Sequence, residues 1–107
     1  MRDVFDALAE PARRAILDEL RVRDGRVVGE LVERLGLSQT SVSKHLKVLR
    51  NAGLVTTLVE GQQRRYLLRP GGMREVEDWL APHRAFWERR FDDLAAHLDR
   101  TYPEEGP

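Results

Sequence analysis

Residues 37–55 read LSQTSVSKHLKVLRNAGLV, and this stretch decides how the rest of the chain is interpreted. Val42, Leu46 and Leu49 recur at intervals of four and three residues, which places them on one face of a helix. The other faces carry glutamine, threonine, serine and lysine, and no carboxylate occurs between Ser38 and Arg50. A polar face that carries only positive charge is suited to phosphates and base edges in a DNA groove.

The residues before this stretch predict a helix-turn-helix. Ser38 fits the N-cap of the cationic helix, and Gly53 is placed to end it. A shorter helix is expected to start at Gly29 and to stop at Gly36, with Leu31, Val32 and Leu35 turned inward. Two short helices that meet at a tight turn have the layout of a helix-turn-helix.

The residues after this stretch predict a two-stranded wing. Residues 54–59 and 64–68 have strand character, and Glu60-Gly61-Gln62-Gln63 lies between them. Gly61 can adopt the positive φ of a tight turn. Pairing Glu60 with Gln63 sets Val59 opposite Arg64 and Thr57 opposite Tyr66. A helix-turn-helix with such a hairpin is a winged helix, so the expected fold class is mainly α (α+β).

Two more helices are expected at the start of the chain. Glu10-Pro11 separates them, since proline is well tolerated at the first position of a helix. Asp24-Gly25 ends the second helix, Arg13 and Arg14 are expected on its outside, and Val27-Val28 is expected to form a very short strand. The residues with helical apolar spacing are Val4, Phe5, Leu8 and Ala9 in the first helix, and Ala12, Ile16, Leu17 and Leu20 in the second.

A long helical region follows Pro70-Gly71-Gly72, and Pro82 is expected to kink or restart it. Its aromatic residues offer more surface than one small core is expected to cover. We therefore predict a two-fold dimer interface there, shared with the first helix, and the alternative is that these side chains only cap the monomer core. The predicted interface residues are Phe5, Trp79, Phe86, Trp87 and Phe91.

Composition limits the remaining classes of function. The formal net charge is zero, yet residues 38–69 carry a net positive charge, because six cations there face Glu60 as the single acid. The chain has no cysteine, which excludes disulfides and thiolate metal sites. No apolar run is long enough to span a membrane, and no signal peptide is recognised, so a cytoplasmic protein is expected. We expect one domain over residues 1–101 and a flexible tail over residues 102–107.

Taken together, these segments resemble the ArsR family of bacterial winged-helix repressors. The residues that carry the resemblance are FDALAEPARRAIL (5–17), GELVERLGLSQTSVSKHL (29–46) and LRNAGLV (49–55), with Glu60-Gly61 and Tyr66 in the wing. The resemblance implies a homodimer that binds a palindromic operator in double-stranded DNA, usually as a repressor, and an effector that releases the DNA. The effector itself stays unknown.

The sequence departs from the metal-sensing members of that family. Residues 30–34 (ELVER) stand where those members carry paired cysteines, and Ala81 stands where an aspartate ligand is expected two residues before His83. The pattern around Trp79, Phe86-Trp87 and Arg90 is similar to the non-metal branch. No metal site and no cofactor are therefore predicted. Weak zinc binding by His83 with Glu88, or by His97 with Asp93, is the alternative.

The sequence predicts two groups of DNA-binding residues and no catalytic site. Base-edge contacts are expected from Gln39, Thr40, Ser43 and Lys44, beside Ser38 at the start of the helix. Phosphate contacts are expected from Lys47, Arg50, Arg64 and Arg65. Ser41 and His45 lack an orienting acid and a nucleophile elbow, so His45 is expected to border the core instead. A protein-binding winged helix and a metal- or ligand-responsive sensor repressor remain alternative functions.

Overall fold

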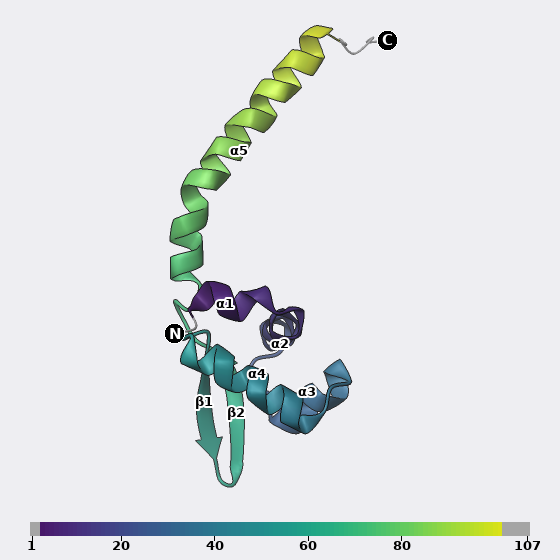
Figure 1. Ribbon diagram of the computed structural model, residues 1–107, viewed down its shortest axis with the longest axis vertical. Coiled ribbons are helices and arrows are strands. Elements are labelled where there is room, and N and C mark those ends of the chain that lie inside the picture. Colours follow the sequence, from purple (N-terminus) through teal and green to yellow (C-terminus); the bar gives the residue numbers. More distant parts are fainter. Residues whose placement is uncertain (1–2, 102–107) are drawn as a thin grey trace. The chain divides into compact units, whose positions relative to one another are not determined.

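The predicted helix-turn-helix and wing are both present in the computed structural model, which describes residues 3–101 (Figure 1). The chain divides into two compact units, residues 1–75 and residues 76–107. The elements are α1 (Val4–Ala9), α2 (Pro11–Val22), α3 (Val28–Leu35), α4 (Gln39–Asn51), β1 (Val55–Glu60), β2 (Gln63–Leu68) and α5 (Arg74–Thr101). The first unit holds the complete winged helix, and the single domain expected over residues 1–101 stays a prediction.

Local signals set the boundaries of α1 and α2. Asp3 caps α1, because its carboxylate accepts a hydrogen bond from the Asp6 backbone N–H at 3.0 Å. The backbone turns extended at Glu10, and Pro11 begins α2 as its first residue. Val4 and Ala7 are the buried residues of α1, whereas Phe5 is 38% exposed.

Four helices and the start of the wing share one core. The largest fully buried side chains come from α2, α3, α4 and β1: Ile16, Leu20, Leu31, Leu46, Leu49, Val42 and Val55. The six helical residues in this set are inward positions that helical spacing predicts, because a stripe at positions i, i+3 and i+4 faces one direction. Gly36 ends α3 with a positive φ of 67°, a conformation that glycine adopts without strain.

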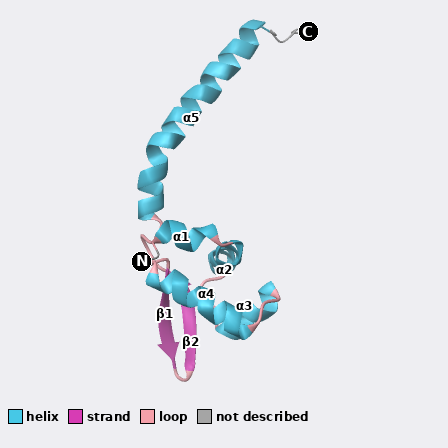
Figure 2. Cartoon of the chain, in the orientation of Figure 1, coloured by secondary structure: helices cyan, strands magenta, loops and turns pink. Residues whose placement is uncertain are grey.

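The wing is a two-stranded antiparallel sheet, drawn in magenta in Figure 2. Its register pairs Glu60 with Gln63, Val59 with Arg64 and Thr57 with Tyr66, as predicted. Gly61 occupies the turn with a φ of 60°, which confirms the role expected for it.

The strand predicted at Val27-Val28 is wrong. Val27 lies at the N-cap of α3, and Val28 is the first residue of that helix. The extended contact falls one residue earlier, where Arg26 forms a single antiparallel bridge with Tyr66 of the wing. The backbone N–H of Tyr66 donates to the Arg26 carbonyl at 2.8 Å. The loop before α3 therefore pairs with the wing in strand fashion at this one position only, since a longer strand would cost α3 its first turn.

The sequence places Arg13 and Arg14 on the outside of α2, but both side chains make hydrogen bonds within the molecule. The Arg13 guanidinium donates to the carbonyls of Ala7 at 2.7 Å and Asp6 at 3.0 Å. Arg14 donates to the carbonyl of Leu8 at 2.6 Å. The last carbonyls of a helix lack partners within it. These two arginines supply the partners for α1 and join it to α2.

The second unit is the α5 segment from Val76 onward. α5 runs without interruption through Pro82, so the helix is continuous and is not restarted there. Several large apolar side chains on it are exposed, among them Trp79, Phe86, Trp87 and Phe91. Within residues 3–101, no helix combines the length and the hydropathy that a membrane span requires. The tail expected over residues 102–107 lies outside the described residues.

Candidate nucleic-acid interface

The cationic face of α4 is directed outward because its opposite face is fixed in the core. Val42 and Leu49 are fully buried, and Leu46 is 1% exposed. At the helix start, the Ser38 hydroxyl accepts a hydrogen bond from the Ser41 backbone N–H at 3.1 Å. Buried side chains at this spacing leave one rotational setting for α4, and the polar residues between them must face solvent.

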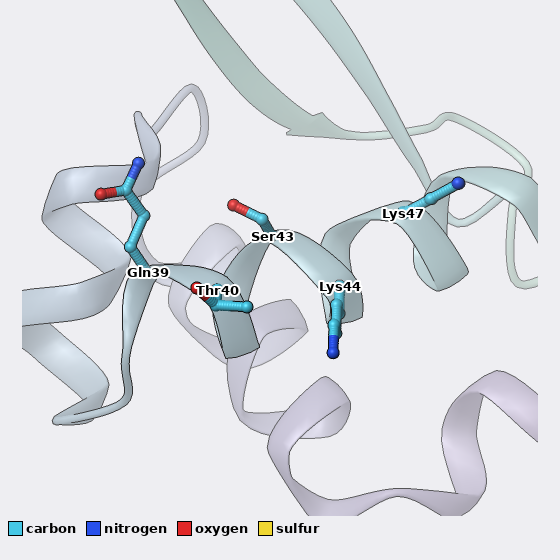
Figure 3. A pocket seen from close by; sticks show the side chains of 5 residues that line it. All are labelled: Gln39, Thr40, Ser43, Lys44 and Lys47. Atoms are coloured by element: carbon cyan, nitrogen blue, oxygen red, sulfur yellow. The ribbon is translucent and has the colours of Figure 1, made fainter.

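Five of the predicted DNA-binding residues line one open depression on this face: Gln39, Thr40, Ser43, Lys44 and Lys47. All five are exposed, and Figure 3 shows their side chains extending from α4. Lys44 points in a different direction from Gln39 and Ser43 in that view. The depression thus offers amide, hydroxyl and ammonium groups, which are the groups that hydrogen-bond to base edges and phosphates.

A second depression lies between α4 and the wing. It brings together Lys47, Arg50 and Arg64, which were predicted as phosphate contacts from separate segments. Its complete lining is Ser43, Leu46, Lys47, Arg50, Asn51, Arg64 and Tyr66. We call this surface the α4–wing groove. Asn51 and Tyr66 were missed by sequence reasoning, since a helix-end asparagine and a strand tyrosine are ordinary in those positions.

The cations on this side of the first unit are unpaired. Within residues 3–101, Lys44, Lys47, Arg50 and Arg64 make no hydrogen bond or ion pair through their side chains. Away from this face, Arg13, Arg14, Arg23, Arg26 and Arg34 are all bonded within the molecule. The charge of the α4–wing side is therefore available to an outside anion.

Arg65 differs from the other predicted phosphate contacts. Its guanidinium pairs with Glu60 at 3.2 Å, donates to the Gly25 carbonyl at 2.8 Å and lies 4.0 Å from Glu30. Neighbouring residues of a strand point to opposite faces, so Arg64 and Arg65 separate. These bonds hold the wing against the loop before α3, and a phosphate contact by Arg65 stays a prediction.

A buried arginine extends this attachment. Arg26 is 6% exposed and bonds to Glu19 of α2 and Glu30 of α3, each at 3.5 Å. Its Nε also donates to the Glu19 backbone carbonyl at 3.2 Å. At the wing's base, the Asp24 carboxylate accepts a hydrogen bond from the Leu68 N–H at 2.9 Å. Charged groups on α2, α3 and β2 therefore meet at one place and set the position of the wing.

His45 borders the core, as the sequence analysis expects. It is half-buried on α4, and its Nδ1 lies 3.5 Å from the Arg13 guanidinium of α2. Because Arg13 also binds the end of α1, this contact joins three helices. Within residues 3–101, no three His, Asp or Glu side chains lie close enough to hold a metal ion together.

The aromatic residues of α5 contact one another along the helix. The Phe86 and Trp87 rings lie 5.4 Å apart edge to face, and Trp87 and Phe91 lie 6.1 Å apart. The Arg90 guanidinium sits 5.9 Å from the Phe86 ring centre. Trp87, Phe91 and Leu94 also line a shallow depression with Arg90 and Asp93. This exposed apolar surface is larger than a solvated helix normally shows.

Comparison with known proteins places the chain in a family. Residues 8–57 match the model of a helix-turn-helix domain. The chain is 38% identical over 95 residues to the HTH-type transcriptional regulator Rv2034 of Mycobacterium tuberculosis, covering 89% of this chain and 85% of that protein. An ArsR-like transcriptional regulator from Rhodococcus sp. RHA1 superposes with a TM-score of 0.67 at 30% identity, covering 94% of this chain and 91% of that one. The chain belongs to the ArsR family of helix-turn-helix transcriptional regulators.

Two further relatives carry names that describe activity or assembly. The transcriptional repressor SdpR of Bacillus subtilis is 32% identical over 80 residues, covering 75% of this chain and 88% of that protein. A homodimeric winged helix-turn-helix DNA-binding domain from Mycobacterium bovis superposes with a TM-score of 0.58 at 28% identity, covering 79% and 75%. The predicted fold and family are confirmed. These relatives are named as regulators, which are not enzymes.

Proposed function

We propose that this ArsR-family protein is a homodimeric repressor that binds a palindromic operator in double-stranded DNA. The observation that carries the proposal is the outward face of α4, which is cationic, free of carboxylates and unpaired. Gln39, Thr40, Ser43 and Lys44 would contact base edges in the major groove, where each base pair displays a distinct pattern. Ser38, which caps α4, stands beside them.

The wing completes the proposed DNA contact. Lys47, Arg50 and Arg64 are exposed and unpaired, so they can neutralise backbone phosphates and release the counterions bound there. Arg64 lies on β2 one pair away from the turn, where it is free to approach the DNA backbone. Arg65 acts from the opposite face by fixing the wing.

Self-association fits this mode of binding. In a two-fold dimer, two α4 helices would meet successive major grooves about 34 Å apart, which matches a palindromic site. We propose Phe5, Trp79, Phe86, Trp87 and Phe91 as the dimer interface. The support is the exposed aromatic surface of α5 and the homodimeric state of the structural relative from Mycobacterium bovis.

A titration tests the proposal directly. Labelled duplex from the protein's own promoter region and a random duplex of equal length are each titrated at low and at moderate salt. A repressor binds the promoter duplex more tightly, and specific sites typically exceed random ones by about 10³-fold or more. Equal affinity for both duplexes at every salt concentration would refute sequence-specific binding. A protein-binding winged helix would give no DNA complex at all.

We also place the protein in the non-metal branch of the family. The absence of cysteine and of a clustered donor set within residues 3–101 supports this placement. Zinc added in excess is expected to leave the affinity for the promoter duplex unchanged. Zinc-dependent release that is abolished in the His83→Ala or His97→Ala variant would instead assign the protein to the metal sensors.

A further inference from the structure

The α4–wing groove differs in character from the exposed face of α4. Three cations, Lys47, Arg50 and Arg64, line it, and no carboxylate does. None of the three has an intramolecular ion-pair partner within residues 3–101. Positive charge gathered in a recess without a counter-charge is suited to an anion smaller than a duplex groove.

Tyr66 supplies a neutral hydrogen-bonding group to the same groove. It lies two residues after Arg64 on β2, and residues at this spacing share one face of a strand. Its backbone is held on both sides, because its N–H donates to the Arg26 carbonyl at 2.8 Å and its carbonyl accepts from Gly25 at 3.1 Å. The backbone that carries the ring is thereby held at the groove wall.

The phenol of Tyr66 has no role in the fold that accounts for its hydroxyl. The side chain is half-buried, yet within residues 3–101 its oxygen makes no hydrogen bond to the protein. Every buried side-chain oxygen or nitrogen within the described residues has a hydrogen-bond partner. Because the Tyr66 oxygen has none, it is not buried and reaches solvent. A tyrosine hydroxyl that reaches solvent is free to donate to an incoming ligand. Asn51, the last residue of α4, is exposed on the same lining.

We propose that the α4–wing groove holds one phosphodiester group of the DNA backbone, with the Tyr66 hydroxyl and the Asn51 amide donating to it. This inference rests on the proposed function and adds a site to it. If α4 enters a groove of the duplex and the wing contacts the adjoining segment, a backbone strand must pass between them. About half to two-thirds of protein–DNA hydrogen bonds go to phosphate and sugar, and tyrosine and asparagine are among their donors.

The Tyr66→Phe variant tests the site, since it removes one oxygen and keeps the ring. A hydrogen bond to a charged group is lost, so affinity for duplex is expected to fall about tenfold for each bound protomer. The fall should be equal for promoter and random duplex, because every sequence has phosphates. The slope of log K against log salt should not change, since no charge is removed, whereas Arg64→Gln should lower it by about 0.9 per bound protomer.

Thr56→Val is the matched control, because it removes an exposed hydroxyl from the other face of the wing. It is expected to leave DNA affinity unchanged. Affinity of Tyr66→Phe equal to that of the wild type would overturn the proposal. A lower melting temperature of Tyr66→Phe that is large enough to explain its loss of DNA affinity would also overturn the proposal, because the hydroxyl would then stabilise the fold. Failure of the wild-type protein to bind any duplex would overturn the proposed function as well.

Asn51→Asp is a second variant of nearly identical shape. It places a carboxylate in the groove, and a phosphodiester bound there would be repelled, so a loss larger than that of Tyr66→Phe is expected. Calorimetry with inorganic phosphate at constant ionic strength separates a DNA backbone group from a free anion. We expect no measurable heat of binding, and tight binding of inorganic phosphate would identify a free-anion site instead.

Discussion

Lys44 and Lys47 both project from the exposed side of α4, but they serve different surfaces. Lys44 lies with Gln39 and Thr40 near the start of the helix, whereas Lys47 also lines the α4–wing groove. Their side chains point in different directions in Figure 3. This difference in position is the basis for proposing a base contact for Lys44 and a phosphate contact for Lys47.

Replacing Lys44 with alanine is expected to relax sequence specificity. The variant should lose about 1–3 kcal/mol of affinity for its operator and little for random duplex, because a base contact exists only in the correct site. Lys47→Ala is the comparison, since it should weaken both duplexes alike and lower the salt slope. Fluorescence anisotropy on the two duplexes measures both effects, and identical profiles for the two variants would contradict the division.

Arg26 contacts the wing through its backbone carbonyl, and its side chain joins α2 to α3. It is buried between Glu19 and Glu30, whose side chains are 19% and 28% exposed. Arg26→Ala removes the buried cation between these two carboxylates, whereas the exposed Arg34 stays 3.0 Å from Glu19 and the exposed Arg23 stays 3.3 Å from Glu30. The free energy of unfolding should therefore fall by roughly 2 kcal/mol, less than for a fully buried pair, because water and these exposed arginines still reach both acids.

Urea denaturation followed by circular dichroism measures this change in the free energy of unfolding. Arg21→Ala is the control, because Arg21 is exposed on α2 and its side chain makes no hydrogen bond or ion pair within residues 3–101. Its replacement should shift stability by no more than about 0.5 kcal/mol. Equal stability of the two variants would show that the network around Arg26 contributes nothing.

Gly29 and Gly72 differ in how much space the surrounding backbone leaves for a side chain. Gly29 lies inside α3, and a Cβ there would meet no atom within 4 Å. Gly72 follows the wing, and a Cβ there would lie 2.8 Å from the Gly53 carbonyl oxygen and 3.1 Å from that of Arg69. Both neighbours at Gly72 are backbone atoms, which cannot move aside as a flexible side chain does.

Alanine at these two positions is expected to have opposite effects. Gly29→Ala should stabilise the fold by about 0.5–1 kcal/mol, because alanine is the better helix former. Gly72→Ala should destabilise it by more than about 1 kcal/mol, since the end of the wing must shift away from α4. Thermal unfolding of both variants checks the prediction. Destabilisation by Gly29→Ala, or a neutral Gly72→Ala, would contradict it.

At the level of elements, sequence reasoning succeeded where the signal is local. Ser38, Gly36 and Gly61 set a cap, a helix end and a turn, and the structure has all three. It failed at Val27-Val28, because β-branched residues fit the start of a helix as well as a strand. It left Pro82 open, since a proline costs one helical hydrogen bond but does not force the residues around it out of α5.

For the whole molecule, the exposed apolar face of α5 is the feature that the winged helix does not explain. Phe91 is 63% exposed and Phe86 is 46% exposed. In a monomer, replacing such residues would change stability little. In a dimer, they would lie in the interface core, where a charge is costly. If the proposed dimer forms, a charged substitution on this face is therefore expected to disrupt the association of the two subunits.

Phe91→Glu is expected to produce a monomer whose winged helix still unfolds as a cooperative unit. Operator affinity should fall at least 100-fold, because the two half-sites no longer bind together. Sedimentation velocity gives the oligomeric state, and anisotropy gives the affinity. Arg89→Glu is the control, since helical spacing puts residue 89 on the opposite face from residue 91. A dimer that persists in Phe91→Glu would exclude this face as the interface.

Local patterns in the sequence were enough to predict the order of the elements, the buried stripes of α2 and α4, the register of the wing and the cationic face of α4. These follow from periodicity, caps and turn residues, which act over a few neighbouring positions. Only the tertiary structure brought Tyr66 and Asn51 into the groove with Lys47 and Arg64, and tied Arg65 to Glu30. Those partners lie far apart along the chain, and their meeting depends on how α3, α4 and the wing pack rather than on any local pattern.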